Sequence, residues 1–288
     1  MNLIILDAGH SKTTKGKVAP DKSLYEWDFN NKIQYKLKSR LENLGFKVCL
    51  TNPDPENTSD IALSTRASKA NKFYTDNKKP NTIMLSIHAN AYGEWTAARG
   101  VEVFHASNAS QNSKNLAKYI CDNIYADIKA IDPGFKNRGV KQEDFTVIYK
   151  TVTPCVLVEY GFYTNKEDLK ILKNNQSDLI EATIKGICKY FNINYQGPKS
   201  ESVKTENIKS NTYYRVVAGS YKDRSNAENM LNRLKLDGYS GFISTFEKDN
   251  TLYYRAVAGS YSVRSNADDL VIKLKATGYA AFIEVYNK

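Results

Sequence analysis

The hydrophobic residues of the first 194 positions fall into short runs that alternate with longer segments of mixed polarity. These runs have the length of β-strands, and they lie at residues 2–6, 47–50, 82–87, 100–104 and 155–160. Several are apolar at consecutive positions, which indicates strands of a sheet that is covered on both faces. The pattern therefore predicts a sheet buried between layers of helices.

The longer segments carry apolar residues at helical spacing. Residues 26–45 show this most clearly, with Gly45 as the stop, and the positions at this spacing are Phe29, Ile33, Leu37, Leu41 and Leu44. Residues 112–128 and 176–191 have the same character. Strands that alternate with helices predict an α/β domain of three layers, with a twisted, mostly parallel sheet and flanking helices.

The last third of the chain has a different organisation. Residues 196–211 are polar, contain a Gly-Pro pair and lack aromatic residues, as expected of an exposed linker. Beyond them, residues 213–246 align without a gap with residues 253–286, and each copy has the pattern strand, turn, helix, Gly-Tyr stop, strand. We therefore predict a domain at 1–195, a linker at 196–211, and a small α+β domain of two βαβ repeats at 212–288.

Composition and charge narrow the classes of partner. A chain with 41% hydrophobic and 25% charged residues is an ordinary globular protein, and no apolar run approaches the roughly 20 residues that a membrane span needs. The net charge of +10 favours a polyanionic partner, such as nucleic acid, an anionic membrane or an acidic cell wall. Because the basic residues are spread over the whole chain instead of forming a stripe, we expect no nucleic-acid binding.

Cysteines and the N-terminus suggest where the chain is made. The four cysteines form no CxxC pair and sit mostly in apolar runs, so we predict reduced core residues and folding in a reducing cytoplasm; they are Cys49, Cys121, Cys155 and Cys188. The first ten residues enter a strand-like run directly, without the basic and long apolar regions of a secretion signal. We expect synthesis in the cytoplasm without a signal peptide.

Three residues with metal-binding or catalytic side chains come at the ends of separate apolar runs. His10 follows the first run, His88 follows the third, and Glu159 lies near the end of the fifth. In an open parallel sheet, ligands and catalytic groups gather at the carboxyl ends of the strands. One histidine in such a place is more often structural, but three residues on independent strands indicate a shared site.

Two imidazoles and a carboxylate form a common zinc-binding set that leaves a fourth position for water. A second carboxylate is available, since Glu26 opens the helix predicted at 26–45 and can reach back to His10. In a hydrolytic zinc site one glutamate would bind the metal, and the other would act as the base for a water molecule. Spacing alone does not say whether Glu26 or Glu159 has which role.

Five motifs around these residues resemble a known family. They are LDAGH (6–10), YEWDFN (25–30), STRASKAN (64–71), SIHANA (86–91) and VEYGFYTN (158–165). In order and spacing they resemble the zinc-dependent N-acetylmuramoyl-L-alanine amidases of the Amidase_3 group, over about residues 1–192. This family cleaves the amide between the lactyl group of N-acetylmuramic acid and L-alanine in peptidoglycan, on a twisted sheet flanked by helices.

The resemblance implies a role for each residue of the set. His10, Glu26 and His88 correspond to the zinc ligands of the family, and Glu159 corresponds to its catalytic carboxylate. One segment departs from the family, which often has further glycines after the first histidine, where this chain has HSKTTKG. The contacts of the loop at residues 11–24 therefore do not follow from the resemblance.

Five other polar residues, three of them in these motifs and two in residues 100–107, are expected to have supporting roles. We predict that His105 is structural or exposed, and that Glu102, on the opposite face of the same strand, supports the site. Arg66 is expected to hold a loop or to pair with a carboxylate. Asn90 and Asn165 follow strands and are expected to fix turns.

The repeats resemble a SPOR (sporulation-related repeat) domain, over about residues 212–287, through YYRVVAGSY and its second copy YYRAVAGSY. SPOR domains bind peptidoglycan, and the resemblance implies a four-stranded sheet whose exposed face binds glycan strands stripped of stem peptides. By alternation, one strand face of each copy carries a tyrosine, an arginine and a valine, namely Tyr213, Arg215, Val217 and Tyr253, Arg255, Val257. The tyrosines and arginines are candidates to contact sugars, or the tyrosines only seal the domain. The opposite face, which is expected to pack on helices, carries Val216, Ala218, Ala256 and Ala258.

Together these features predict a zinc-dependent peptidoglycan amidase that a glycan-binding domain targets to the cell wall. Such a protein would act on the wall after release, as a phage endolysin or as a mother-cell autolysin. The alternatives are a zinc peptidase that acts on stem peptides, and a wall-binding protein without catalysis. Sequence gives neither the oligomeric state nor the preferred type of peptidoglycan.

Overall fold

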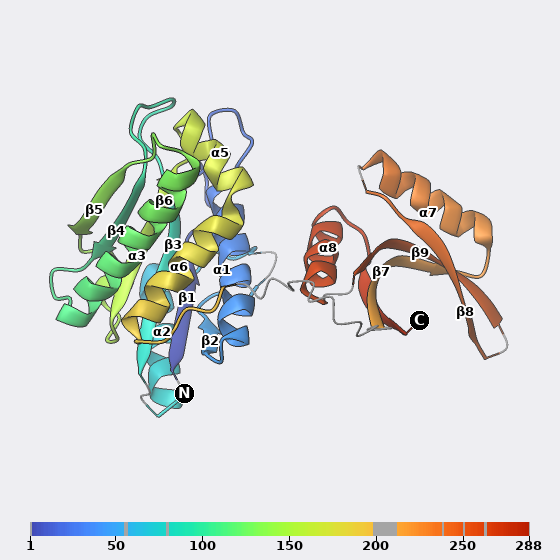
Figure 1. Ribbon diagram of the computed structural model, residues 1–288, viewed down its shortest axis with the longest axis horizontal. Helices are drawn as coiled ribbons and strands as arrows, with labels where there is room; N and C mark the ends of the chain where they lie inside the picture. The colour runs from blue at the N-terminus through green and yellow to red at the C-terminus, as the bar shows by residue number, and fades with distance from the viewer. Residues whose placement is uncertain are drawn as a thin grey trace. The chain divides into compact units, whose positions relative to one another are not determined.

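The structure is a computed structural model of the chain, and it describes residues 2–54, 57–78, 81–197, 212–237, 239–249, 251–261 and 264–287. The chain divides into two compact units, Met1–Ser202 and Val203–Lys288, which are described separately (Figure 1). Residues 198–211 of the predicted linker lie outside the described residues. In the part of the chain that the structure describes, no helix has the length and apolar character needed to cross a membrane.

A six-stranded sheet with the order β2-β1-β3-β6-β4-β5 forms the centre of the first unit. Its strands are β1 (Leu3–Ala8), β2 (Lys47–Leu50), β3 (Thr82–Asn90), β4 (Val101–His105), β5 (Asn137–Gln142) and β6 (Cys155–Phe162). All neighbouring strands run parallel except β4 and β6, which are antiparallel. The predicted mostly parallel sheet is confirmed, and it brings the ends of β1, β3 and β6 next to one another.

Helices cover both faces of this sheet. One face packs against four helices: α1 (Glu26–Asn43), α3 (Gln111–Ile131), α5 (Lys166–Asn174) and α6 (Gln176–Tyr190). Figure 1 shows α1, α6 and α3 side by side across this face. The other face packs against α2 (Leu63–Asp76) and the single turn α4 (Thr146–Tyr149). The three-layer architecture expected from the alternating pattern is thus present.

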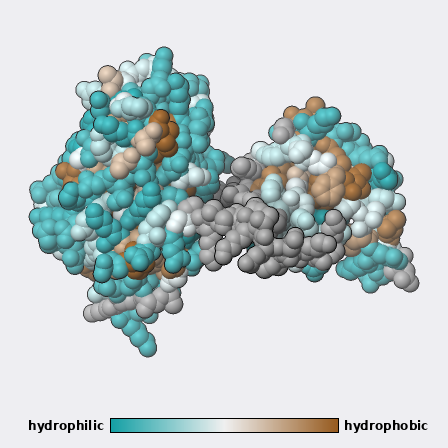
Figure 2. All heavy atoms as spheres, viewed as in Figure 1, coloured by the Kyte–Doolittle hydropathy of each residue, from teal (hydrophilic) through white to brown (hydrophobic). Residues whose placement is uncertain are grey.

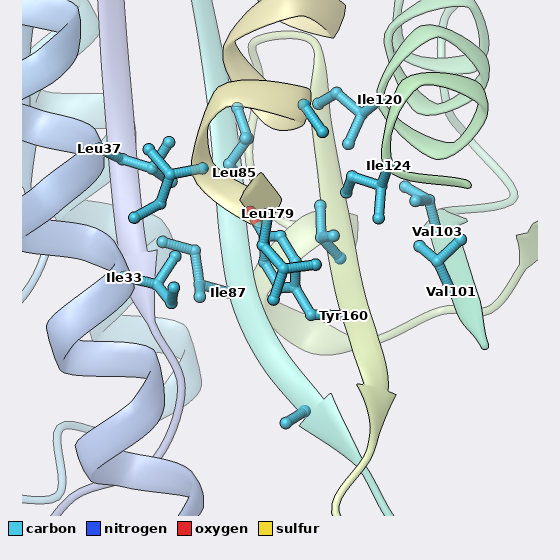
Figure 3. Close-up of a cluster of buried hydrophobic side chains, with 14 of the residues drawn as sticks. Ile33, Leu37, Leu85, Ile87, Val101, Val103, Ile120, Ile124, Tyr160 and Leu179 are labelled. Atoms are coloured by element: carbon cyan, nitrogen blue, oxygen red, sulfur yellow. The ribbon is translucent and has the colours of Figure 1, made fainter. Parts of the chain in front are cut away.

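The larger core lies between the sheet and the four-helix face. In Figure 3, Ile33 and Leu37 of α1 approach the strands from one side, and Ile120 and Ile124 of α3 approach from the other. Tyr160 of β6 stands between these groups, fully buried. Each Å² of apolar surface that these side chains remove from water stabilises the fold by about 25 cal/mol. This packing makes β3 and β6 rigid supports. Outside the core, the face of this unit seen in Figure 2 is mostly hydrophilic.

Several elements extend or add to the sequence pattern. β3 continues to Asn90, so that His88 lies within a strand and not after its end, and β6 continues to Phe162. α2, α5 and β5 were not predicted. The edge strand β5 carries mostly polar, exposed side chains, which show no apolar run. The helix predicted to stop at Gly45 ends at Asn43, and Gly45 has the left-handed φ of +83° that suits a helix terminus.

The second unit folds as two βαβ repeats around an antiparallel sheet with the order β10-β7-β9-β8. The repeats are β7 (Thr212–Tyr221), α7 (Arg224–Leu236) and β8 (Phe242–Lys248), then β9 (Thr251–Tyr261), α8 (Arg264–Ala276) and β10 (Phe282–Asn287). Val216, Ala218 and Ala258 pack with the two helices in one core cluster, as predicted, and Ala256 is buried. The opposite side of the sheet carries no helix among the described residues, and we call it the open face.

Candidate active site

Three side chains that can bind a metal meet at the carboxyl ends of β1 and β3. Glu26 is the first residue of α1, and its Oε1 atom lies 3.0 Å from Nδ1 of His88 and 3.3 Å from Nε2 of His10. His88 belongs to β3, whereas His10 lies just beyond β1. The ligand atoms of the three residues all lie within 4.8 Å of one another. The structure thus brings together the three predicted ligands.

Close packing of the backbone positions both histidines. Gly9 lies against the ring of His88, and a Cβ atom on Gly9 would be only 2.0 Å from Cε1 of that ring. His10 has a left-handed φ of +61°, and its carbonyl oxygen accepts a hydrogen bond of 2.9 Å from the side chain of Asn57. The side chain of Asn30 donates to the Gly9 carbonyl oxygen at 3.0 Å. A residue without a side chain is therefore required at position 9.

Burial and mutual contacts set the charges of this group. Burial alone would raise the pKa of Glu26, but hydrogen bonds and charge interactions with His10 and His88 outweigh it and lower the pKa to about 2. Burial lowers the pKa of His88, an effect that Glu26 only partly offsets. At neutral pH the group therefore combines an ionised carboxylate with a neutral His88 imidazole, which is the protonation state that metal binding requires.

Glu159 lies beside this group on β6. It is opposite His88 where β3 and β6 pair, and opposite Glu102 where β6 and β4 pair. Its Oε2 atom is buried and has no hydrogen-bond partner among the described residues. Burial, followed by the charges of Glu26 and Glu102, raises the pKa of Glu159 well above its usual value. A carboxyl group in this state holds a proton more readily than an exposed glutamic acid does.

A buried ion pair joins the central strands close to these residues. Asp7 of β1 is fully buried, and its Oδ1 atom accepts a hydrogen bond of 2.7 Å from Nε of Arg66, with a second contact through Nη2. Ser86 of β3 donates to the same carboxylate at 2.7 Å, and Thr51 contacts it as well. Arg66 thus pairs with a carboxylate, one of the two roles expected of it, and ties α2 to the central strands.

The predicted supporting residue Glu102 is held by a cluster of polar groups. Its carboxylate accepts hydrogen bonds from Nε of Arg138 at 2.6 Å, from Nζ of Lys141 and from the side chain of Asn90. A β-bulge where β4 meets β5 lies next to Arg138, and such bulges redirect side chains. The guanidinium of Arg138 lies 4.8 Å from the ring centre of Phe162. Sequence reasoning missed Arg138 and Lys141 because β5 shows no apolar run.

The loop at residues 11–24 forms one wall of a cavity next to the site. The cavity has a volume of about 320 Å³. Its lining from the loop is Gly16, Val18 and Pro20, and the facing residues include Ala91, Trp95 and Tyr163. The loop is fixed to the site because the Glu26 amide donates to the Lys17 carbonyl at 2.9 Å. The loop that the sequence left without contacts therefore shapes a space large enough for part of a substrate.

The remaining candidates have structural contacts. His105 is half-buried, and its Nδ1 atom lies 2.9 Å from the carbonyl oxygen of Ala106. The side chain of Asn165 caps α5 by accepting from the amides of Glu167 and Asp168. Asn90 accepts from the Ala91 amide as well as donating to Glu102. All three contacts agree with the supporting roles expected of these residues.

A family comparison identifies the first unit. The model of the Amidase_3 family, N-acetylmuramoyl-L-alanine amidase, matches residues 4–189. The chain belongs to this family. The SPOR domain model matches residues 192–245 and 210–284, so the amidase carries a C-terminal SPOR domain. Both resemblances found in the sequence motifs are confirmed, and so is the enzyme class.

Relatives and solved structures agree with this assignment. The amidase is 31% identical over 222 residues to the endolysin of Bacillus phage SPP1, with 75% of each chain covered. It is 25% identical over 244 residues to the sporulation-specific N-acetylmuramoyl-L-alanine amidase of Bacillus subtilis (strain 168), with 83% of each covered. The catalytic domain of CwlV, an N-acetylmuramoyl-L-alanine amidase from Bacillus (Paenibacillus) polymyxa var. colistinus, superposes with a TM-score of 0.56 at 27% identity. That comparison covers 67% of this chain and all of the CwlV domain.

The open face of the SPOR domain carries the four residues predicted from its strands. Tyr213 is opposite Tyr286 across β7 and β10, and Tyr253 stacks on Phe246 with 5.1 Å between ring centres. The guanidinium carbon of each arginine lies over an aromatic ring, at 3.2 Å from the ring centre for Arg215 on Tyr286 and at 3.4 Å for Arg255 on Phe246. This face is thus a surface of aromatic rings and arginines.

Proposed function

We propose that His10, Glu26 and His88 bind a zinc ion and that Glu159 is the catalytic carboxylate of a peptidoglycan amidase. The observation that carries the proposal is the place of Glu159, which lies next to three ligand side chains with a buried oxygen that has no partner among the described residues. The bond cleaved would be the amide between the lactyl group of N-acetylmuramic acid and L-alanine.

The residues fit a zinc ion in number, chemistry and spacing. Catalytic zinc sites use three protein ligands drawn from His and Glu or Asp and keep a fourth position open. Tetrahedral ligands at about 2.1 Å from zinc lie about 3.4 Å from one another. The Glu26 oxygen is 3.0 Å and 3.3 Å from the two imidazole nitrogens, close to this spacing, and all three ligand atoms lie within 4.8 Å of one another. All three ligands come from rigid elements or are held by asparagine side chains.

In the proposed reaction, the residues of the chain orient the substrate and move one proton. A zinc ion held by the three ligands would supply a Lewis acid that polarises the scissile carbonyl and activates water. Glu159 takes a proton from the attacking water, and it later delivers this proton to the nitrogen of the leaving L-alanine. Burial and the negative charges of Glu26 and Glu102 raise the pKa of Glu159, which favours acceptance of the proton from water and its retention until the leaving nitrogen takes it.

The cavity next to the site provides a place for the substrate. Trp95 lines the cavity and is 43% exposed, and Nζ of Lys166 lies 5.4 Å from its ring centre. An exposed indole offers a platform for a sugar ring, and the wall formed by Gly16 to Pro20 leaves room beside it. We therefore place one part of the glycan–peptide junction between the loop at 11–24 and Trp95.

The SPOR domain would keep the enzyme at the cell wall by binding glycan strands from which stem peptides have been removed. Its open face offers aromatic rings and arginines, which stack on sugar rings and hydrogen-bond to their substituents. The catalytic unit produces such strands, so binding its own product would hold the enzyme near regions of active cleavage. The similarity to a phage endolysin and to a sporulation amidase supports release onto the wall at lysis, in one setting or the other.

A turbidity assay on purified cell walls, with and without a chelator, tests the catalytic proposal. Wild-type protein should clear the walls, lose activity with the chelator and regain it with Zn²⁺. Mass spectrometry of the products should find whole stem peptides that begin with L-alanine. Cleavage inside the stem peptides would instead identify a peptidase.

Three variants test the roles of the individual residues. Glu159→Gln should abolish cleavage but retain one zinc ion per chain, whereas His88→Ala should lose the metal. Zinc loss from Glu159→Gln, with zinc retained by Glu26→Gln, would reverse the roles of the two glutamates.

A further inference from the structure

The open face of the SPOR domain is nearly two-fold symmetric. The pseudo-equivalent positions of the two repeats carry the same type of side chain: Tyr213 and Tyr253, Arg215 and Arg255, Phe242 and Phe282. The contacts are also paired. Arg215 lies over Tyr286 and 5.6 Å from the ring centre of Phe242, while Arg255 lies over Phe246 and 6.0 Å from that of Phe282. A surface with this symmetry would present two equal cationic sites.

One charged residue breaks the symmetry around the two arginines. Position 284 is Glu, whereas its equivalent in the first repeat, position 244, is Ser. The carboxylate of Glu284 forms an ion pair with Nη1 of Arg255, although the strand register places Glu284 directly opposite Arg215. The charge of Arg255 is therefore neutralised by a partner that Arg215 lacks.

Arg215 keeps its charge without an ion pair. Among the described residues it has no ion pair, and its guanidinium lies over the rings of Tyr286 and Phe242. The buried Nε atoms of both arginines lack a hydrogen-bond partner, so the difference between the two is the ion pair of Arg255. Ser244, which occupies the place equivalent to Glu284, carries no charge. Two arginines and one glutamate leave a single net positive charge on this part of the face, and its unpaired carrier is Arg215.

Hydrolysis of the muramoyl amide changes the charge of the glycan in a way that this residue can recognise. Water adds across the amide bond, the nitrogen leaves as the amine of L-alanine, and the lactyl carbonyl carbon becomes a carboxylate. Each cleaved muramic acid thus gains a negative charge that intact peptidoglycan hides in a neutral amide. A guanidinium that lies on an aromatic ring and has free N–H groups is suited to bind a carboxylate.

We propose that Arg215 binds the free lactyl carboxylate of muramic acid, and that the ion pair with Glu284 prevents Arg255 from binding one. This inference rests on the proposed binding of denuded glycan, and it adds the group that is recognised and the half of the face that recognises it. A single anion site on an otherwise symmetric surface also gives the bound glycan strand one preferred direction, since the strand itself has a direction.

The test compares two matched glycans on the full-length protein. The first is an oligosaccharide of alternating N-acetylglucosamine and N-acetylmuramic acid without stem peptides. The second is the same oligosaccharide with its lactyl carboxylates converted to primary amides, so that only the charge differs. Neither contains the lactyl–L-alanine bond, so the amidase does not consume them during calorimetric titration. Wild-type protein should bind the carboxylate form about ten- to a hundredfold more tightly at low salt.

Charge-swap variants separate Arg215 from its equivalent. Ser244→Glu should remove the preference because it gives Arg215 the partner that Arg255 already has. Glu284→Ser should increase the affinity for the carboxylate form by freeing Arg255. The double variant with both changes should restore a wild-type preference, carried now by Arg255. Each new residue already exists at the equivalent position of the other repeat, and thermal melting checks that the domain remains folded.

The outcomes are distinct. A wild-type protein that binds both glycans equally, or a Ser244→Glu variant that keeps the full preference, overturns the inference while leaving glycan binding intact. Loss of the preference in Ser244→Glu without recovery in the double variant also overturns it. Binding of neither glycan by wild-type protein overturns the proposed role of the SPOR domain itself.

Discussion

Replacement of Gly9 by alanine should disable the proposed zinc site through a single methyl group. A Cβ atom at this position would lie 2.0 Å from Cε1 of His88 and 2.4 Å from its Nε2. Carbon atoms in contact normally lie about 3.5–4.0 Å apart, so the imidazole or the backbone must move by about 1.5 Å. Gly9 does not have a positive φ, and alanine therefore meets no backbone strain there. The effect comes from the displaced ring alone.

A shift of this size is large for a metal site. Misplacement of a reacting group by about 1 Å can cost a factor of about 100 in rate. We expect Gly9→Ala to lower both zinc affinity and the rate of wall clearing by at least about a hundredfold. Zinc affinity is measured by titration with a competing chelator, and clearing is measured by turbidity at saturating and at limiting zinc.

The same clash should appear in the stability of the metal-free protein. Overpacking costs about 1–3 kcal/mol, which urea unfolding in the presence of a chelator can measure. In a His88→Ala background the ring is gone, so the added methyl group should cost nothing. This double-mutant cycle isolates the contact between positions 9 and 88. Wild-type zinc affinity in Gly9→Ala, or an equal loss of stability in both backgrounds, would show that the methyl group does not act through the ring of His88.

Three further predictions concern stability and reactivity. Arg66→Met leaves the buried Asp7 without its charged partner and should cost about 3–5 kcal/mol in urea unfolding, whereas a loss below about 1 kcal/mol would count against the ion pair. Although burial raises it, the charge and hydrogen bonds of Arg66 lower the pKa of Asp7. The ionised Asp7 should therefore stabilise the folded protein fully above about pH 4, and this stabilisation should be lost as the pH falls further. A plot of unfolding free energy against pH should lack this change in Arg66→Met. Burial raises the pKa of the Cys155 thiol to about 12. A thiol reagent at pH 8 should therefore label the half-buried Cys49 first and Cys155 only after unfolding. Rapid labelling of Cys155 in the folded protein would contradict this. Asn165→Ala removes the cap of α5 and should cost about 1 kcal/mol in the same unfolding assay, with Asn165→Asp as the control that keeps the cap.

Sequence predicted the parts of the fold that are buried on both faces. β1, β3 and β6 appear as continuous apolar runs because helices cover both sides of them, and α1 appears because only one of its faces is buried. β5 could not be found in this way, since it is an edge strand with mostly exposed polar side chains. Its contribution, Arg138 and Lys141 on Glu102, depends on the pairing of strands that are far apart in the sequence.

The residues of the candidate site could be predicted from the sequence, but the role of each glutamate could not be predicted from the residue pattern alone. His10, His88 and Glu159 stand out because each is a metal-binding or catalytic side chain at or near the end of a separate apolar run. Two glutamates were available, and the residue pattern alone did not assign them. The geometry favours Glu26 as the ligand, since its Oε1 atom lies within 3.3 Å of both imidazoles while a Glu159 oxygen stays without a partner among the described residues.

On the open face of the SPOR domain, the sequence does not predict which arginine forms an ion pair. The repeat predicts that Arg215 and Arg255 are equivalent, and strand register assigns Glu284 to Arg215 as its neighbour. In the structure Glu284 instead pairs with Arg255, across the intervening strand β7. Long side chains on a sheet face can reach beyond the adjacent strand, so their partners are decided by the three-dimensional arrangement of rings and charges. The charge difference at one pair of equivalent positions, Ser244 and Glu284, then leaves Arg255 with an ion pair and Arg215 without one among the described residues.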